Sequence, residues 1–470
     1  MTFNSVAYAI FLPVVVAVCW RLRHRAQNVF LVAASYVFYG YWDPRFLLLL
    51  WFTTGADFVI AQRIEGEDDD KRRKRWLLLA LTVQLGILGY FKYAGFFVDS
   101  TRVLLSRVGI EPHVPILRVL LPIGVSFYTF QSISYTFDVY RRRMRATRNL
   151  VDYALFVAFF PVLVAGPIER ARHLLPQVAR PRTKPSIEKV RSGVGLILLG
   201  LFKKVVLADA MGPVADAAFG THHPAATTVV FGAYAFAIQI YADFSGYSDI
   251  ARGSARLLGF ELIRNFEQPY LSRNITEFWR RWHISLSTWL RDYLYVPLGG
   301  NRRGKLTTYR NLFLTMVLGG LWHGAGLPFV MWGAAHGALL AVHRWRTGET
   351  TSSVSDGPIR TGDVGRIFVT FQLTTLAWIV FRSSGFSQVA MMFGGLVHLH
   401  GASLSADDVA LVGLAFGVMV VMDLLQRLRP TFEAWTRTPR PVRAAAYAVL
   451  VLGLIVWSGG SARPFIYFHF

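Results

Sequence analysis

Long apolar runs recur along the whole chain and constrain its fold more than any other feature. Runs of about 20 nearly uncharged residues, such as 76–95, 227–244, 366–382 and 408–426, are separated by short clusters of arginine and lysine. A helix of about 20 apolar residues spans the hydrocarbon core of a bilayer, where backbone groups must be satisfied within the segment or in a closed barrel. The runs do not alternate between apolar and polar residues, which favours helices. The sequence therefore predicts an all-α, polytopic membrane protein.

The basic clusters fit a regular membrane topology. Arg21–Arg25, Lys71–Arg75 and Arg141–Arg145 follow the first, third and fifth predicted spans. Because cytoplasmic loops carry an excess of lysine and arginine, these clusters are expected to be cytoplasmic, which places the N-terminus outside the cytoplasm. Counting onward gives about 11–12 transmembrane helices, which would put the terminal FIYFHF outside as well.

One apolar run breaks this count. Residues 151–168 contain Pro161, Gly166 and Pro167, and basic residues lie on both sides of the run. A full crossing would place one basic cluster outside, so we expect a re-entrant segment that returns to the cytoplasm beside protein or a water-filled cavity. We expect residues 1–470 to form a single integral membrane domain, with N-terminal helices in 1–140, a core in 141–345 and C-terminal helices in 346–470.

The net charge of +22 has a membrane explanation. The basic residues sit between spans, where they set topology and contact anionic lipid, so we expect membrane lipids and no nucleic acid as partners. The alternative is a basic cytoplasmic surface that also binds a phosphorylated donor or an acidic carrier protein. The only cysteine, Cys19, excludes disulfides and cysteine metal sites.

An aromatic, arginine-rich segment at 275–294 carries the first histidine of interest, His283. At 100° per residue most of its apolar side chains fall on one face and most of its charged side chains on the other, which predicts one interfacial amphipathic helix. His283 lies at the edge of the apolar face and would point into the protein. It is either a site residue or a packing histidine with satisfied hydrogen bonds.

A second histidine, His323, lies inside the next apolar segment. A helix starting near Arg310 would carry it about 20 Å along its axis, well into a core about 30 Å thick. Glycines flank it on both sides and favour close backbone approach or an unwound stretch beside a cavity. A neutral imidazole at that depth can act as a general base towards a hydroxyl. The alternative is a histidine that hydrogen-bonds between helices.

Other polar groups have weaker signals. Tyr241 opens the polar stretch YADFSGYSD, which would line a cavity or cap helices. His336, thirteen residues after His323, is interpreted as structural. The chain contains no HxxxxD motif, GxSxG elbow, Walker loop or HExxH motif. We expect no metal and no bound cofactor.

Two long motifs resemble a known family. The segment RNITEFWRRWHISLSTWLRDYLYVPLGGNRRG (Arg273–Gly304) and the LWHG at Leu321–Gly324 are similar to the membrane-bound O-acyltransferase (MBOAT) superfamily. The resemblance is strongest to the membrane components of bacterial alginate and peptidoglycan O-acetyltransferases. Further stretches of this branch are Leu121–Arg141, Phe159–Arg170 and Tyr241–Gly253.

The resemblance implies a ring of tilted helices around a central tunnel, and it maps the paired catalytic histidines of the family onto His283 and His323. We expect His323 to activate the accepting hydroxyl and His283 to position or polarise a thioester carbonyl. We further expect a set of side chains to contact the donor or substrate, with the basic ones either near the donor's phosphates or bound to anionic lipid. These residues are Tyr241, Arg280, Arg281, Trp282, Asp292, Arg302, Arg303, Lys305 and Trp322.

The expected function is O-acylation in the bacterial cytoplasmic (inner) membrane. The acyl group, expected to be acetyl from acetyl-CoA, would cross the membrane to a cell-surface or exported polysaccharide, by relay through an extracytoplasmic SGNH-type acetyltransferase partner. One alternative is D-alanyl transfer from a carrier protein. Another is a transporter or flippase that moves a polysaccharide or acyl donor without bond chemistry.

Overall fold

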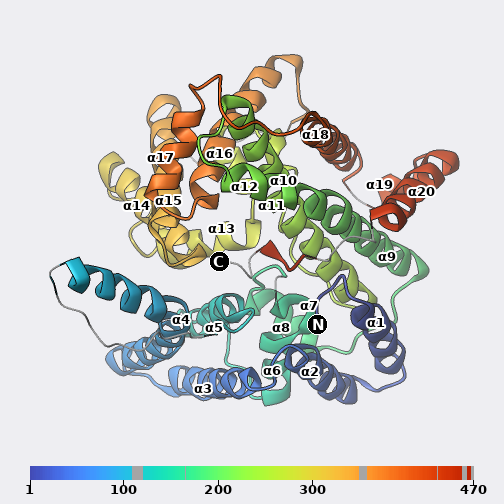
Figure 1. Cartoon of the computed structure of the whole chain (residues 1–470). Coiled ribbons are helices and arrows are strands. Elements are labelled where there is room, and N and C mark those ends of the chain that lie inside the picture. The colour runs from blue at the N-terminus through green and yellow to red at the C-terminus, as the bar shows by residue number, and fades with distance from the viewer. Residues whose placement is uncertain are drawn as a thin grey trace. The chain divides into compact units, whose positions relative to one another are not determined.

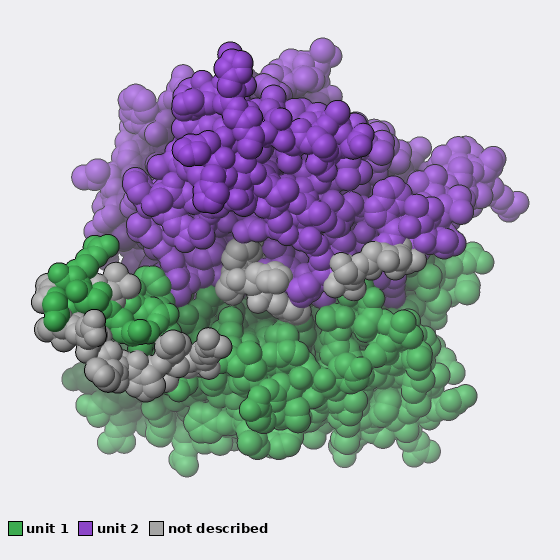
Figure 2. All heavy atoms as spheres, viewed as in Figure 1, with its two compact units in different colours: residues 1–194, 251–263 green, residues 195–250, 264–470 purple. Residues whose placement is uncertain are grey.

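Helices make up the fold of the computed structural model, which describes residues 1–107, 109, 120–164, 166–348, 357–430, 432–457 and 463–466. Within these residues the only β-type pairing is an isolated bridge between Pro224 and Ala402. The predicted all-α class is therefore confirmed. The chain divides into two compact units, residues 1–194 with 251–263 and residues 195–250 with 264–470 (Figure 2).

The first unit contains the N-terminal helices. They are α1 (Val6–Cys19), α2 (His24–Gly40), α3 (Phe46–Gly66), α4 (Asp70–Arg107), α5 (Val125–Tyr140), α6 (Leu150–Ala158), α7 (Phe160–Leu163) and α8 (Ala171–Ala179). Helices α3, α4 and α5 pack on one another, and α6 packs on α2 and α8. The buried carboxylate of Asp57 on α3 accepts a hydrogen bond of 2.6 Å from Gln84 on α4.

The apolar run 151–168 is broken, as its prolines and glycine predict. It forms α6, of nine residues, and α7, of four, with a non-helical Phe159 between them. Neither helix approaches the roughly 20 residues that span a bilayer core. The broken backbone agrees with a re-entrant segment, whose path through lipid remains a prediction.

Two long helices run across the division between the units, α9 (Ile187–Phe202) and α11 (Ala226–Leu257). The other elements of the second unit are the π-helix η1 (Lys203–Ala208), α10 (Asp209–Gly220), the 3-10 turn η2 (Pro269–Leu271), α12 (Ile275–Arg281), α13 (Ile284–Leu290), the π-helix η3 (Arg291–Tyr295), α14 (Lys305–His323), α15 (Leu327–Thr347), the 3-10 turn η4 (Thr361–Asp363), α16 (Val364–Arg382), α17 (Phe386–Gly395), α18 (Ala406–Leu428), α19 (Phe432–Thr436) and α20 (Arg440–Trp457).

Six helical segments in the described part of the chain are long and apolar enough to cross a membrane. They are Phe46–Gly66, Asp70–Arg107, Ala226–Leu257, Thr361–Arg382, Ala406–Leu428 and Arg440–Trp457. The other predicted spans coincide with α1, α2, α5, α9, α14 and α15, which are 14 to 21 residues long. Each predicted span thus has a helix, although residues 116–119 of the fifth predicted span (116–138) and residues 458–459 of the last one (442–459) lie outside the described residues.

Helices α14 and α15 form a close hairpin that positions the second histidine (Figure 1). A Cβ atom at Gly320 on α14 would overlap the carbonyl oxygen of Phe329, and one at Gly333 on α15 would overlap that of Met316. Small residues let two helical backbones approach in this way. The hairpin therefore depends on glycine on both of its helices.

Candidate active site

His283 lies at a break between two short helices. Helix α12 ends at Arg281, Trp282 is extended, and His283 adopts left-handed backbone angles (φ 43°, ψ 54°) before α13 begins at Ile284. The prediction of one continuous amphipathic helix over 275–294 is therefore wrong. The Ile284 N–H donates 2.9 Å to the carbonyl oxygen of Asn265, a long-range contact that replaces the helical one.

The imidazole of His283 is fully buried among aromatic rings. Its centroid lies 4.5 Å from that of Phe244, with the rings perpendicular, and 6.4 Å from that of Phe266. Its Nδ1 atom lies 3.1 Å from Oδ1 of Asn265, and its Nε2 atom has no hydrogen-bond partner among the described residues. Burial lowers the pKa of His283 to about 3, so the ring is neutral at physiological pH.

His323 is the last residue of α14. Gly324 follows with extended angles and ends the helix, and a Cβ there would collide with the Phe329 ring. The backbone thus leaves the helix at the glycines and approaches Phe329 closely, which agrees with both alternatives that the sequence left open. The His323 side chain is buried, with ring centroids 5.2 Å from Trp332 on α15 and 5.3 Å from Phe381 on α16.

Trp322 contacts both histidines. Its ring centroid lies 6.3 Å from that of His283 and 4.9 Å from that of its neighbour His323. The side chain is buried, so the shared contact lies inside the second unit. The two motifs that the sequence singled out therefore meet around one indole ring.

Trp282 and Tyr241 extend the same aromatic cluster. Trp282 lies 5.1 Å from Phe266, which also contacts His283, and 6.1 Å from Tyr241. Tyr241 lies within α11, so it does not cap that helix, one of the two roles that the sequence left open for its polar stretch. Its hydroxyl donates 2.8 Å to the buried carboxylate of Asp423 on α18.

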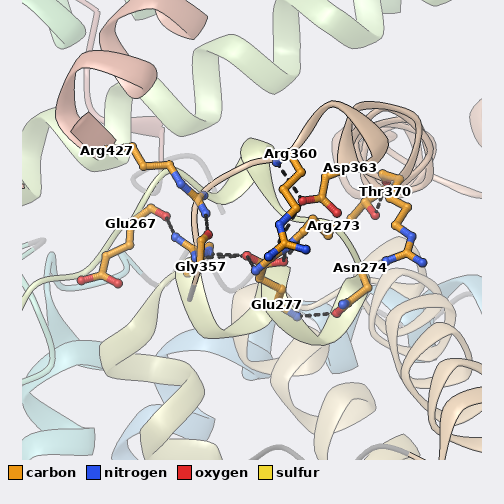
Figure 3. Close-up of polar contacts among 11 residues, drawn as sticks. Glu267, Arg273, Asn274, Glu277, Gly357, Arg360, Asp363, Thr370 and Arg427 are labelled. Carbon is orange, nitrogen blue, oxygen red and sulfur yellow. Dashed lines mark hydrogen bonds and ion pairs between the residues drawn. The ribbon is translucent and has the colours of Figure 1, made fainter. Parts of the chain in front are cut away.

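Arg281 belongs to a buried ion-pair network. It pairs with Glu277 at 3.0 Å and donates to the Glu267 carbonyl oxygen at 3.2 Å, while Arg273 pairs with Glu277 at 2.9 Å. Figure 3 shows Arg273 between Glu277 and Asp363. Burial alone would raise the pKa of Glu277, but the hydrogen bonds from Arg273 and the charges of both arginines hold it below its usual range.

The other predicted contacts are the basic group Arg302, Arg303 and Lys305, together with Arg280 and Asp292. Arg302, Arg303 and Lys305 are exposed where α14 begins, and His323 ends that helix eighteen residues later, about 27 Å along the axis. Arg280 is half-buried, and Asp292 pairs with Arg291 at 2.8 Å. The basic group and His323 thus lie at opposite ends of α14.

Several site residues carried no readable sequence signal. Asn265 bonds His283 from eighteen positions upstream, and Phe244, Trp332 and Phe381 complete the aromatic surroundings. His336, interpreted as structural, is buried, and its Nδ1 accepts a hydrogen bond of 3.3 Å from Trp279 Nε1. Among the described residues, no group of three or more His, Cys, Asp or Glu side chains could hold a metal ion.

Comparison with known proteins places these motifs in a family context. The model of the MBOAT, membrane-bound O-acyltransferase family matches residues 129–385, which include both histidines. The chain is 42% identical to the probable alginate O-acetylase AlgI of Pseudomonas putida over 100% of both chains. It is 34% identical to the peptidoglycan O-acetyltransferase of Helicobacter pylori, over 86% of this chain and 81% of that protein. It is 26% identical to the teichoic acid D-alanyltransferase of Bacillus subtilis, over 50% and 62%.

Proposed function

This chain belongs to the membrane-bound O-acyltransferase family, and on that premise we propose that it moves an acetyl group from a cytoplasmic thioester to a polysaccharide outside the membrane. Membership makes the chain a multi-pass O-acyltransferase of the bacterial cytoplasmic membrane. The donor, the crossing of the membrane and the acceptor are the proposed parts. A transporter that lacks bond chemistry is not supported, because the family is enzymatic.

One observation carries the proposal: His283 and His323 are buried and share the Trp322 ring. Histidine is the usual side chain for proton transfer near neutral pH, and an aromatic enclosure keeps bulk water from hydrolysing a thioester. In this proposal a substrate would enter the enclosure between the helices and reach the imidazole of His323. This combination suits acyl transfer to a hydroxyl.

In the proposed reaction one proton moves from the accepting hydroxyl to the leaving thiolate by way of His323. A ring nitrogen of His323 takes the proton of the accepting hydroxyl as its oxygen bonds to the thioester carbonyl carbon. The carbon–sulfur bond of the tetrahedral intermediate then breaks, and the proton passes from His323 to the leaving thiolate. The products are an O-acetyl ester and a free thiol, with no other co-reactant.

Acetyl-CoA is the proposed donor. The exposed Arg302, Arg303 and Lys305 at the start of α14 offer charge-assisted contacts for its phosphates. Because their end of the helix is about 27 Å from His323, they would hold the nucleotide end while the pantetheine arm reaches inward. Arg281 is engaged by Glu277 and fits an architectural role in the wall better than phosphate binding.

The acceptor is proposed to be a polysaccharide, since relatives of this chain carry the names alginate O-acetylase and peptidoglycan O-acetyltransferase. A relay through an extracytoplasmic SGNH-type acetyltransferase would take the group from the membrane to the polymer. D-alanyl transfer from a carrier protein is the second candidate, supported by the similarity to teichoic acid D-alanyltransferases.

Labelled donors separate these two candidates. Membrane vesicles from cells that produce the full chain, its extracytoplasmic partner and the surface glycan would receive either isotope-labelled acetyl-CoA or a D-alanyl-loaded carrier protein. The glycan esters would then be identified by mass spectrometry. The proposal predicts labelled acetyl esters from acetyl-CoA, and their loss in His323→Ala. Alanyl esters alone, or no dependence on His323, would overturn it.

A further inference from the structure

We propose that Asn265 is a positioning residue that holds His283 in one tautomer, with the proton on Nδ1 and the lone pair on Nε2. This inference rests on the proposed function, because it specifies what His283 offers to the substrate. It reassigns His283 from polarising a thioester carbonyl to accepting a hydrogen bond or a proton.

The orientation of the Asn265 amide is fixed by its neighbours. The backbone N–H of Ser285 points to Oδ1 at 3.3 Å, and the Ser285 hydroxyl lies 3.0 Å from the same atom. A backbone N–H can only donate, so the atom that it meets must be the amide oxygen. The amide nitrogen is then free to donate to the Ser248 hydroxyl at 3.2 Å. Both ends of the amide agree with this single orientation.

The tautomer of His283 follows from that orientation. Its Nδ1 lies 3.1 Å from the Asn265 oxygen, which can only accept, so Nδ1 must carry the hydrogen. In a neutral imidazole the other nitrogen is then an acceptor. The ring is neutral because burial keeps its pKa low, and the side chains around it, Phe244, Phe266, Trp322 and Asn265, carry no charge.

Asn265 also holds the backbone of His283. Its carbonyl oxygen accepts the Ile284 N–H at 2.9 Å, while its side chain binds the imidazole and the Ser285 N–H. His283 occupies the left-handed region, which a residue other than glycine adopts when surrounding contacts require it. Asn265 thus fixes both the left-handed backbone of His283 and the orientation of its imidazole ring.

His336 provides an internal contrast. Its Nδ1 lies 3.3 Å from Nε1 of Trp279, and an indole N–H can only donate. His336 must therefore accept at Nδ1 and carry its proton on Nε2, the reverse of His283. Two fully buried histidines of one unit thus hold opposite tautomers, each set by the partner of Nδ1.

The assignment limits the chemistry of His283. A neutral ring with its lone pair on Nε2 cannot donate a hydrogen bond from that atom to a carbonyl oxygen. It can accept one from a substrate hydroxyl or amide, and it can take up a proton there. The resulting imidazolium would still donate from Nδ1 to Asn265, which stabilises it.

The first test reads the tautomer directly. The full chain would be labelled with ¹⁵N-histidine and reconstituted in lipid, and the His283 signals would be assigned by difference against His283→Gln. Solid-state NMR is expected to show Nδ1–H and an unprotonated Nε2 in the wild type and in Asn265→Asp. Asn265→Leu is expected to lose this preference. Protonated Nε2 in the wild type would overturn the proposal.

The second test measures acetyl transfer from acetyl-CoA over a range of pH. Loss of a partner that orients a catalytic histidine costs roughly 10–100-fold in activity, so Asn265→Leu should lower kcat by that factor. Asn265→Asp should recover most of kcat, because its carboxylate also accepts from Nδ1. That carboxylate raises the pKa of His283, so the ring becomes protonated at a higher pH than in the wild type. As the pH is lowered, the variant should therefore lose activity before the wild type does.

A matched control separates this role from folding. Asn311 is equally buried and binds the carbonyl oxygens of Leu298 and Gly300, so Asn311→Leu should lower thermal stability without changing the His283 signals. Wild-type kcat in Asn265→Leu, beside an active wild type, would refute the inference and leave the proposed function standing. An inactive wild type with the expected Nδ1–H signal would instead refute the proposed function.

Discussion

The imidazole of His283 and the indole of Trp322 meet edge to face, with their ring centroids 6.3 Å apart. The same indole lies 4.9 Å from the imidazole of His323. Two histidines that are 40 positions apart in the sequence are thereby brought to one ring. Substitutions at these rings and at the polar contacts around them test whether this arrangement serves acyl transfer.

Shortening Trp322 should impair both stability and catalysis. The side chain is buried, and truncating a core tryptophan to alanine costs about 3–5 kcal/mol. Trp322→Phe should keep a ring against both histidines and retain more activity than Trp322→Ala. Thermal denaturation in detergent and acetyl-transfer rates would measure both effects. The control is Trp345→Ala, whose side chain is 72% exposed and should change stability by at most about 0.5 kcal/mol. Equal rates in the wild type and Trp322→Ala would contradict a role for this ring.

Tyr241 should contribute to stability mainly through its hydrogen bond to Asp423. Its hydroxyl donates to that buried carboxylate, so Tyr241→Phe should cost about 1–3 kcal/mol by leaving the acceptor unsatisfied. Most of this cost should disappear when Asp423 is already asparagine, as a double-mutant cycle of thermal stabilities would show. Tyr41→Phe, at an exposed ring, is the control. A raised KM for the donor with unchanged stability would instead support direct donor binding by Tyr241.

Glu277 should make stability depend on pH. Its folded pKa is lowered, so its ionised form stabilises the fold above the ordinary carboxyl pKa, and this contribution is lost as pH falls through the lower folded value. Glu277→Gln should cost about 3 kcal/mol near neutral pH and flatten the acid loss of stability. Denaturation curves from neutral to acid pH would show this. Glu261→Gln, which breaks a partly exposed pair with Arg256, should cost only about 0.2–1 kcal/mol. An unchanged acid profile in Glu277→Gln would contradict the assignment.

Patterns set by the bilayer were readable from the sequence, whereas contacts between distant segments were not. Apolar length predicted the helices, and Pro161 predicted the break between α6 and α7, because these features act locally. The break at His283 was missed because Asn265, eighteen positions upstream, takes the Ile284 N–H. The helical period over 275–294 gave no sign of this competing partner.

The sequence predicted the two histidines of the candidate site but only some of the side chains that surround them. The LWHG motif located His323 and its neighbour Trp322, and the structure joins them to His283. Arg281 looked available for phosphate, but Glu277 lies one helical turn earlier and pairs with it. Sequence spacing allowed that pair but could not show that both side chains are buried.

Acetyl transfer by a His323→Ala variant tests the central claim most directly. The variant and the wild type would be produced at matched levels in a deletion strain, with His222→Ala, at an exposed histidine, as control. Mass spectrometry would then measure O-acetyl esters on the cell-surface glycan. Loss of a general base typically lowers rates by 10²–10⁴-fold, so we predict near-complete loss of esters in His323→Ala. The cavity left by the buried ring should lower the melting temperature, and a cooperative melting transition of the variant would show that it still folds. Wild-type ester content in that variant would contradict the account.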